Sequence, residues 1–399
     1  MLASGESSEL TAAMQYQFAD CTLDTNAHTL TRDGQAQSIE PQVFDLLHLL
    51  IRHAGELVTK DQLIAEIWGG RIVSESAMSA RIAAARKAVG DDGKQQKVIR
   101  TVSRRGLQFV AALEGAANPA PVAETPAPTI RYATAEDGCK IAYAVSGNGP
   151  PLLRLAYYPT HLELEWQSKV ERPFFERLMQ THTLIRIDQR GSGLSDIDIT
   201  DFSVARTVRD AKAVLDALGI DRAAVIGESS GGMIAAAFAA SYPAHVSHVI
   251  TIGGYVDGRS RRGNDIDDAI MTMAQAGWET PGSAFMTGYL SVYFPSVPQE
   301  LLLDWANMMQ KSCRVENEVA GRSFFNNHSI APELGKVEAP TLVVHSRDDA
   351  VHPLSEGQKM ARGIPAAELM VMESRNHVPI HIEPSWENMM QAISAFLER

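Results

Sequence analysis

The pattern of apolar and polar residues changes character partway along the chain. Up to about residue 112, short alternating runs such as YQFADCTL and HTLTRDG precede longer helical patterns. From residue 130 onward, nearly continuous apolar runs alternate with helical segments; the runs are THTLIRID, AAVIGES, SHVITIGG, APTLVVHS and AELMVMES. This alternation is typical of parallel strands that are joined by crossover helices and covered on both faces. The pattern predicts an α+β part followed by an α/β part with a mostly parallel sheet.

The segment between these parts has the composition of a spacer. Residues 114–128, EGAANPAPVAETPAP, mix alanine with four prolines, a composition that favours an extended, semi-rigid chain. The 399 residues, 45% of them hydrophobic, are also too many for one ordinary domain. We therefore expect one domain at 15–112, a linker at 113–129 and a second domain at 130–399.

Three helical patterns and a hairpin signal follow the first strands. PQVFDLLHLLIRHAG begins with proline and ends at glycine, as helices often do. LVTKDQLIAEIWGG offers Thr59 and Gln62 as a capping box and ends at a glycine pair. SESAMSARIAAARKAVG is the third helical pattern, and VIRTVSRRGLQFVAAL contains two strand-like runs around Arg104 and Arg105. Strands, three helices and a basic hairpin in this order predict a winged helix.

The segments FDLLHLLIRHAGELVTKDQLIAEIWGG, RKAVGD and IRTVSRRGLQFVA resemble the DNA-binding domain of OmpR/PhoB-type response regulators. The resemblance implies that the third helix enters the major groove of double-stranded DNA and that the hairpin, or wing, reaches the minor groove. It places these residues on the DNA-binding surface: Ser76, Ala80, Arg81, Arg86, Lys87, Thr101, Arg104 and Arg105. Ala83 and Ala84 stand where relatives often carry polar residues, which favours backbone contacts and shape readout. The alternative is that the arginines form an ordinary solvated face.

Charge is distributed unevenly around this domain. The whole chain has a net charge of -12, yet residues 71–105 carry nine basic and three acidic side chains, a local excess that attracts phosphate. The three cysteines are far apart and have no metal-ligand spacing. No signal peptide or run of about 18 apolar residues is visible. We expect a cytoplasmic protein without metal or membrane partner.

A reactive serine is the central candidate of the second part. VIGESSGGM, residues 225–233, fits G-x-S-x-G between a predicted strand and a predicted helix. Small residues at Gly227 and Gly231 relieve crowding in such a turn, so that Ser229 projects from its apex. The backbone N–H of Ser230 can then face a developing oxyanion. Because a serine hydroxyl needs a base, a histidine and an acid are expected later in the chain.

Two later segments supply these groups at strand ends. APTLVVHSRDDAVHP offers Asp348 or Asp349, and ESRNHVPIHIEP offers His377 or His381. The order serine, acid, histidine and the segment DQRGSGLSD resemble α/β-hydrolases over about residues 130–399. The family's usual turn selects Asp349, which precedes Val351 and Pro353. It selects His377, which precedes Glu383 and Pro384, and leaves His345, His352 and His381 as structural or surface histidines.

The chain departs from the α/β-hydrolase pattern in one loop. After the run PLLRLA many members have His-Gly, whose loop provides a second oxyanion donor, whereas this chain reads YYPTHLELEW. Tyr157 or Tyr158 could donate instead, from backbone or side chain. Losing such a donor typically costs about a hundredfold or more in rate. Turnover therefore stays an open question.

Residues 254–335 are predicted to form a helical cap over Ser229. Methionine and aromatic side chains there either line an apolar pocket or pack the cap against the core; they are Met271, Met273, Trp278, Met286, Tyr289, Trp305 and Met308. RSRRGND, residues 259–265, is expected to be a solvated basic loop.

Two functional hypotheses follow. The first is a one-component transcription regulator whose second domain senses, and could hydrolyse, a small apolar ester, lactone or related carbonyl compound. The second is an esterase-like serine hydrolase that the winged helix only localises or regulates. Neither needs a cofactor, and the chain lacks a G-x-x-x-x-G-K-[ST] loop. The resemblance also implies a homodimer on DNA.

Overall fold

The computed structural model describes residues 15–25, 27–55, 57–68, 73–102, 105–114, 127–263 and 266–399. The chain divides into two compact units, Met1–Pro126 and Ala127–Arg399. The expected glycine pair after the second helix, Arg104 and most of the expected linker lie outside the described residues.

The first unit begins with an antiparallel sheet. Its strands run in the order β4-β3-β2-β1-β8, where β1 is Gln15–Phe18, β2 Cys21–Asp24, β3 Thr29–Arg32, β4 Gln35–Gln37 and β8 Leu113–Glu114. The alternating runs of the sequence form β1 to β3, as predicted. Leu113 pairs with Phe18, so the sheet of this unit includes the first two residues of the range expected for the linker.

The remaining elements of the first unit make the winged helix. They are α1 (Pro41–Arg52), β5 (Leu57–Thr59), α2 (Lys60–Trp68), α3 (Glu75–Ala88), β6 (Ile99–Val102) and β7 (Gly106–Phe109). The predicted capping box is present: the Thr59 N–H donates to Gln62 Oε1 at 2.8 Å, and the Gln62 N–H donates to Thr59 Oγ1 at 3.3 Å. β5, β7 and β6 form the three-stranded sheet of the wing.

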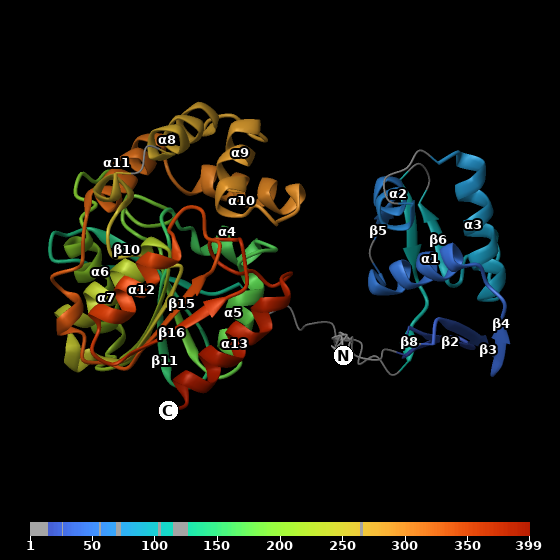
Figure 1. Ribbon diagram of the computed structural model, residues 1–399, viewed down its shortest axis with the longest axis horizontal. Helices are drawn as coiled ribbons and strands as arrows, with labels where there is room; N and C mark the ends of the chain where they lie inside the picture. Colours follow the sequence, from blue (N-terminus) through green and yellow to red (C-terminus); the bar gives the residue numbers. More distant parts are fainter. Residues whose placement is uncertain are drawn as a thin grey trace, which may run out of the picture. The chain divides into compact units, whose positions relative to one another are not determined.

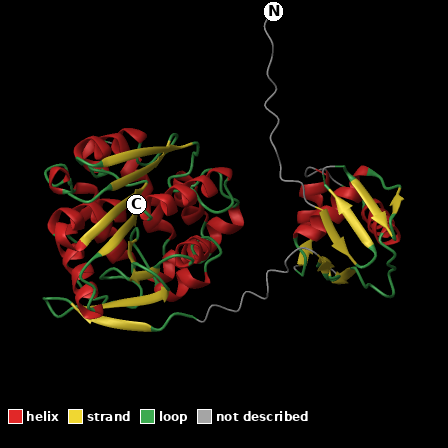
Figure 2. Cartoon of the chain, turned by 90° about the horizontal axis from the view of Figure 1, so that it is seen from below, coloured by secondary structure: helices red, strands yellow, loops and turns green. Residues whose placement is uncertain are grey.

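The second unit is built on an eight-stranded sheet with the order β16-β15-β14-β13-β11-β12-β10-β9. Figure 2 shows its strands in yellow with red helices around them. The strands are β9 (Ile130–Thr134), β10 (Lys140–Gly147), β11 (Pro151–Leu155), β12 (Thr183–Ile187), β13 (Ala223–Glu228), β14 (Val246–Ile252), β15 (Thr341–Ser346) and β16 (Ala367–Met372). Adjacent strands of the sheet are parallel from β12 to β16. At the other edge, β10 is antiparallel to both of its neighbours, β12 and β9. The five apolar runs of the sequence are all strands.

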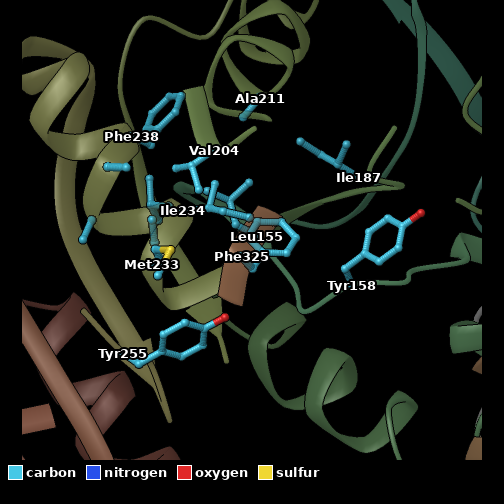
Figure 3. Packing of buried hydrophobic residues seen from close by; sticks show 14 of the residues in the cluster. Leu155, Tyr158, Ile187, Val204, Ala211, Met233, Ile234, Phe238, Tyr255 and Phe325 are labelled. Carbon is cyan, nitrogen blue, oxygen red and sulfur yellow. The ribbon is translucent and has the colours of Figure 1, made fainter. Parts of the chain in front are cut away.

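Helices cover both faces of this sheet and bury its apolar side chains. They are α4 (Leu162–Gln167), α5 (Arg172–Met179), α6 (Val204–Leu218), α7 (Ser230–Ser241), α12 (Leu354–Gly363) and α13 (Pro384–Leu397). Met233, Ile234 and Phe238 of α7 pack with Leu155 on one face (Figure 3). On the other face α5 and α13 bury a second core around Phe175. The central strands are thereby fixed from both sides, which holds their carboxyl ends in place.

Between β14 and β15 the chain forms a helical cap. Its helices are α8 (Ile266–Gly277), α9 (Ala284–Tyr293), α10 (Gln299–Ser312) and α11 (Val315–Asn327), and they gather at one end of the second unit (Figure 1). A short 3-10 turn, Arg259–Arg262, leads into them.

Candidate functional site

Ser229 occupies a sharp turn between β13 and α7. Its backbone has φ 55° and ψ -122°, a left-handed conformation that a non-glycine residue adopts only under strain. Two glycines make the turn possible. A Cβ on Gly227 would lie 2.1 Å from the Gly231 carbonyl oxygen, and one on Gly231 would lie 1.9 Å from the Leu155 carbonyl oxygen. The G-x-S-x-G spacing therefore reflects close backbone approaches on both sides of Ser229.

Asp349 and His377 lie side by side in the loops after β15 and β16. His377 Nδ1 is 2.6 Å from Asp349 Oδ2, and Asp349 Oδ1 accepts the backbone N–H groups of Val351 and His352. Burial opposes ionisation of Asp349, but His377 and the His352 N–H outweigh it and hold the pKa of Asp349 below its ordinary value. An ionised Asp349 fixes the His377 ring. Among the described residues, no group hydrogen-bonds His377 Nε2.

Two further histidines pack around this pair. His345 Nε2 is 2.7 Å from the His352 carbonyl oxygen and 3.6 Å from Asp349 Oδ2. The His352 ring stacks on Tyr255 at 3.8 Å and lies 5.1 Å from the His377 ring. Burial, with the neighbouring cationic groups, holds the pKa of His352 well below its ordinary value. Both histidines are buried, as expected for structural residues, but His352 also lines the cavity into which Ser229 and His377 open.

Ser229 and His377 open into one cavity of about 90 Å³ in the second unit. Strand ends, α5 and the cap all contribute to its wall, which combines aromatic and charged side chains. The wall includes Tyr157, Glu171, Glu228, Arg259, Tyr289, Tyr293, Trp305 and Arg322. The cap also touches the histidine loop directly, because the His377 N–H donates to the Tyr293 carbonyl oxygen at 2.7 Å.

The cap residues named from the sequence divide into two groups. Tyr289 and Trp305 line the cavity, and Met309 lines it where Met308 was expected. The other five are absent from the cavity wall; they are Met271, Met273, Trp278, Met286 and Met308. Trp278, for example, donates to the Cys313 carbonyl oxygen within the cap. Most of the set therefore packs the cap, which was the alternative interpretation.

The prediction of a solvated loop at residues 259–265 is wrong at its first residue. Arg259 is only 1% exposed and lines the cavity. Its Nη1 donates to the Tyr293 hydroxyl at 2.9 Å, and Arg322 Nη1 donates to the same oxygen at 2.9 Å. Arg322 also pairs with the buried carboxylate of Glu318. This side of the cavity therefore presents two guanidinium groups that converge on the Tyr293 hydroxyl.

Tyr157 belongs to a chain of hydrogen bonds beside the cavity. Its hydroxyl accepts from Trp305 Nε1 at 2.7 Å and donates to Glu171 Oε1 at 2.6 Å. Glu171 in turn accepts from Arg154, which also binds Glu228. The Tyr157 hydroxyl is thus engaged within the protein, whereas the Ser230 N–H lies in the first turn of α7, where helical N–H groups have no helical partner.

The sequence interpretation missed these buried charges, although a signal existed. Arg154 and Arg186 interrupt the otherwise apolar runs of β11 and β12, and Glu228 ends the buried β13. A single charge in a buried strand requires a partner, because burying it alone is costly. The partners Glu165 and Glu171 lie on α4 and at the start of α5, too far along the chain for local patterns to pair them.

In the winged helix, the expected DNA-contacting residues differ in exposure. Ser76, Ala80 and Lys87 on α3 and Thr101 and Arg105 at the wing are exposed. Arg100 of β6 is exposed as well. These exposed side chains of α3 and the wing form a surface that is open to a DNA phosphate backbone.

Two arginines of the same set are partly buried and hold elements together. Arg86 Nη2 donates to the Ile99 carbonyl oxygen at 3.1 Å and to Thr101 Oγ1 at 2.7 Å, which ties the end of α3 to the wing. Arg81 Nη2 pairs with Glu40 Oε2 at 3.0 Å, and its Nε donates to Gln42. Both positions thus have a structural role that the sequence pattern did not indicate.

The fold and these two sites define a winged helix joined to an α/β protein with a serine at the strand–helix turn. Residues 164–384 match the family model described as alpha/beta hydrolase fold, and residues 34–109 match the model described as transcriptional regulatory protein, C terminal. The chain belongs to the α/β-hydrolase fold family and carries an OmpR/PhoB-type winged helix at residues 34–109. Both resemblances noted from the sequence are confirmed.

Relatives of the hydrolase part include hydrolases whose names describe 2-hydroxy-6-oxo acids. A 2-hydroxy-6-oxononadienedioate/2-hydroxy-6-oxononatrienedioate hydrolase of Paraburkholderia phymatum is 33% identical over 207 residues, 49% of this chain and 70% of that protein. A 2-hydroxy-6-oxo-6-phenylhexa-2,4-dienoate hydrolase of Burkholderia cepacia is 30% identical over 42% of this chain and 61% of that protein. The hydrolase part is therefore homologous to these enzymes.

Solved structures agree at the level of fold. An esterase from Rhodococcus sp. has a TM-score of 0.58 at 24% identity, with 67% of this chain and 98% of that chain covered. An enol-lactonase from Burkholderia xenovorans has a TM-score of 0.55 at 17% identity, with 67% of this chain and 100% of that chain covered.

Within the described parts of the chain, no helix has the length and apolarity needed to span a membrane.

Proposed function

We propose that this protein is a one-component transcription regulator: the winged helix binds double-stranded DNA, and the α/β-hydrolase unit senses a small carbonyl compound. The observation that carries the proposal is the presence, on one chain, of a DNA-binding family domain and of a cavity lined by Ser229 and His377. We place its action in the cytoplasm, on DNA, as a homodimer. A ligand regulates such a protein only if it binds two conformations with different affinity.

The chemistry proposed for the cavity is attack by Ser229 on the ligand carbonyl. His377 takes the serine proton and later donates it to the leaving group, while Asp349 orients the ring. The Ser230 N–H, supported by the N-terminus of α7, stabilises the oxyanion. The Tyr157 hydroxyl donates to Glu171 and is not available to the ligand. The second oxyanion donor that we propose is therefore the backbone N–H of Tyr157.

The ligand proposed is an ester, lactone or related carbonyl compound that is largely apolar and also carries a carboxylate. The aromatic wall accommodates the apolar part, and the Arg259–Arg322 side of the cavity attracts the carboxylate. The relatives' names, which describe hydrolases of 2-hydroxy-6-oxo acids, support this class.

One experiment tests sensing and chemistry together. The full chain is labelled with a fluorophosphonate, a probe that forms an adduct with activated serines, and its affinity for DNA from its own upstream region is measured by fluorescence anisotropy. We expect labelling of the wild type and a change in DNA affinity of at least about fivefold, the usual lower limit of allosteric coupling. Ser229→Ala should neither label nor respond. Ser230→Ala keeps the backbone N–H and is the matched control that should label like the wild type.

The outcomes separate the two candidate functions. An adduct on Ser229 that leaves DNA affinity unchanged favours the second candidate, an esterase-like hydrolase that the winged helix only localises. The Asp349–His377 hydrogen bond of 2.6 Å and the strained Ser229 backbone are the observations that favour this candidate. A folded wild type that forms no adduct rejects the proposed serine chemistry.

A further inference from the structure

A cluster of buried charges lies directly behind the turn that holds Ser229. Arg154 is its centre: Nε donates to Glu228 Oε1 at 3.0 Å, Nη1 to Glu165 Oε2 at 3.1 Å and Nη2 to Glu171 Oε2 at 2.9 Å. Arg186 Nη1 reaches Glu165 Oε2 at 3.4 Å. We call these five residues the acid cluster.

Strand register explains how the acid cluster assembles. Arg154 lies beside Arg186 on one neighbouring strand and beside Ile226 on the other. Because residues two apart on a strand face the same side, Glu228 shares the face of Ile226 and Arg154. Glu165 and Glu171 approach the same face from α4 and from the residue before α5.

The charges of the acid cluster do not balance. It contains two guanidinium groups and three carboxyl groups, and every member is at most 6% exposed. A buried carboxylate without a compensating charge is unstable and takes up a proton instead. Tyr157, Asp188 and His161 are the other titratable groups that face the cluster. Neither Tyr157 nor Asp188 adds positive charge, and burial lowers the pKa of His161, which favours its neutral form. The imbalance therefore calls for a proton on one of the three carboxyl groups.

Hydrogen-bond partners show which carboxyl group is least compensated. Glu165 Oε2 accepts from both arginines. Glu171 accepts from Arg154 on one oxygen and from the Tyr157 hydroxyl on the other. Glu228 Oε1 accepts from Arg154 Nε, whereas no described residue hydrogen-bonds the buried Oε2 atom of Glu228. Glu228 is also adjacent to Ser229 and lines the same cavity.

Burial acts in the same direction on both carboxyl groups of the cluster that line the cavity. Burial raises the pKa of Glu228, and it raises the pKa of Glu171 to about 7, even though Arg154 opposes both shifts. The two carboxyl groups on the cavity are thus the ones that burial drives toward the neutral form.

We propose that Glu228 is a neutral carboxylic acid at pH 7 and donates a hydrogen bond from Oε2 to the ligand's carbonyl oxygen in the cavity. This role rests on the proposed function of the Ser229 site. It supplies a side-chain donor in a protein whose YYPTHLELEW loop lacks the His-Gly of many α/β-hydrolases. A carboxylic acid held neutral by an apolar site can act as an oxyanion donor in this way. The proton stays on Glu228, while His377 carries out the proton transfers.

Two variants of similar size test the proposal. In Glu228→Gln, the amide oxygen can still accept from Arg154 while the amide N–H donates into the cavity. In Glu228→Met, no donor remains. Both variants leave two guanidinium groups and two carboxylates in the cluster, so both should fold, which thermal melting checks.

The first readout is acylation by p-nitrophenyl butyrate, measured as kcat/KM from pH 5.5 to 9. We expect Glu228→Gln to match the wild type within about threefold near pH 6 and to retain activity at high pH, where the wild type loses its donor proton. Glu228→Met should be about a hundredfold less active than Glu228→Gln at every pH, the usual effect of removing one oxyanion donor, and its deficit relative to the wild type should shrink at high pH. Equal activity of the two variants, or a wild type that gains activity as Glu228 ionises, overturns the proposal.

The second readout does not depend on turnover. An infrared difference spectrum between the wild type and Glu228→Gln at pH 7 should contain the C=O stretch of a protonated carboxyl group. Absence of that band overturns the proposal even if the wild type proves inert toward esters. An inert wild type that shows the band rejects the proposed serine chemistry and leaves the protonated Glu228 standing.

Discussion

Replacing Gly231 by alanine tests whether the Ser229 turn depends on close backbone packing. The added Cβ would lie 1.9 Å from the Leu155 carbonyl oxygen and 2.7 Å from that of Ala156. Ordinary contact begins at 3.4 Å, so α7 or β11 must move by about 1.5 Å. β11 is bonded on both sides, to β12 and β13, and cannot move freely. We therefore expect a loss of about 3 kcal/mol, the upper end of the usual overpacking range.

This loss corresponds to a fall of about 6–12 °C in the melting temperature of a unit of this size. Tryptophan fluorescence reports it, because four of the five tryptophans lie in the second unit, at positions 166, 278, 305 and 386. Labelling of Ser229 by a fluorophosphonate should fall in parallel. Gly335→Ala is the matched control, since a Cβ there meets no atom within 4 Å. If Gly231→Ala melts within about 2 °C of the wild type and labels normally, the reasoning from backbone contact is wrong.

Four further substitutions probe other parts of the molecule. Asp349→Asn should lower ester turnover by about 10⁴-fold without unfolding the protein, because His377 loses the acceptor that orients it. Steady-state kinetics measure the turnover, and a melting curve checks the fold. Undiminished turnover would exclude Asp349 from the mechanism. Burial raises the pKa of Asp91, but hydrogen bonds from four backbone N–H groups outweigh it and hold the pKa below its ordinary value. Its stabilisation of the first unit is therefore present at neutral pH and is lost as the pH falls through the folded-state pKa. Asp91→Ala should cost roughly 3 kcal/mol at pH 7 and much less in acid, as hydrogen exchange at residues 97–99 can measure; an equal loss at both pH values contradicts the assignment. Arg105→Ala should reduce the salt dependence of DNA binding by about one phosphate contact without lowering the melting temperature. Arg86→Ala should also lower the melting temperature, because Arg86 ties α3 to the wing. Identical melting curves for the two variants would contradict the structural role of Arg86.

Local sequence determined the elements whose causes are local. The capping box at Thr59 and Gln62 forms between neighbours, and strand runs bounded by turn residues form the sheet as predicted. The Ser229 turn was predictable for the same reason, because its glycines relieve contacts that every strand–turn–helix of this kind creates. Family resemblance then selected Asp349 and His377 from two pairs of alternatives, and the structure places these two side chains 2.6 Å apart.

Tertiary structure alone decided which polar side chains became buried and what they face. Arg259 lies in a basic stretch typical of a solvated loop, yet cap helices that follow it in the chain enclose it. Tyr289, Trp305 and Met309 line the cavity while Met286 and Met308 do not, because the rotation of each cap helix is set by packing against its partners. The acid cluster around Arg154 needs β11, β12, β13, α4 and the start of α5 at once. Pairing of charges over such distances depends on strand order and helix placement, which the periodicity of a single sequence does not contain.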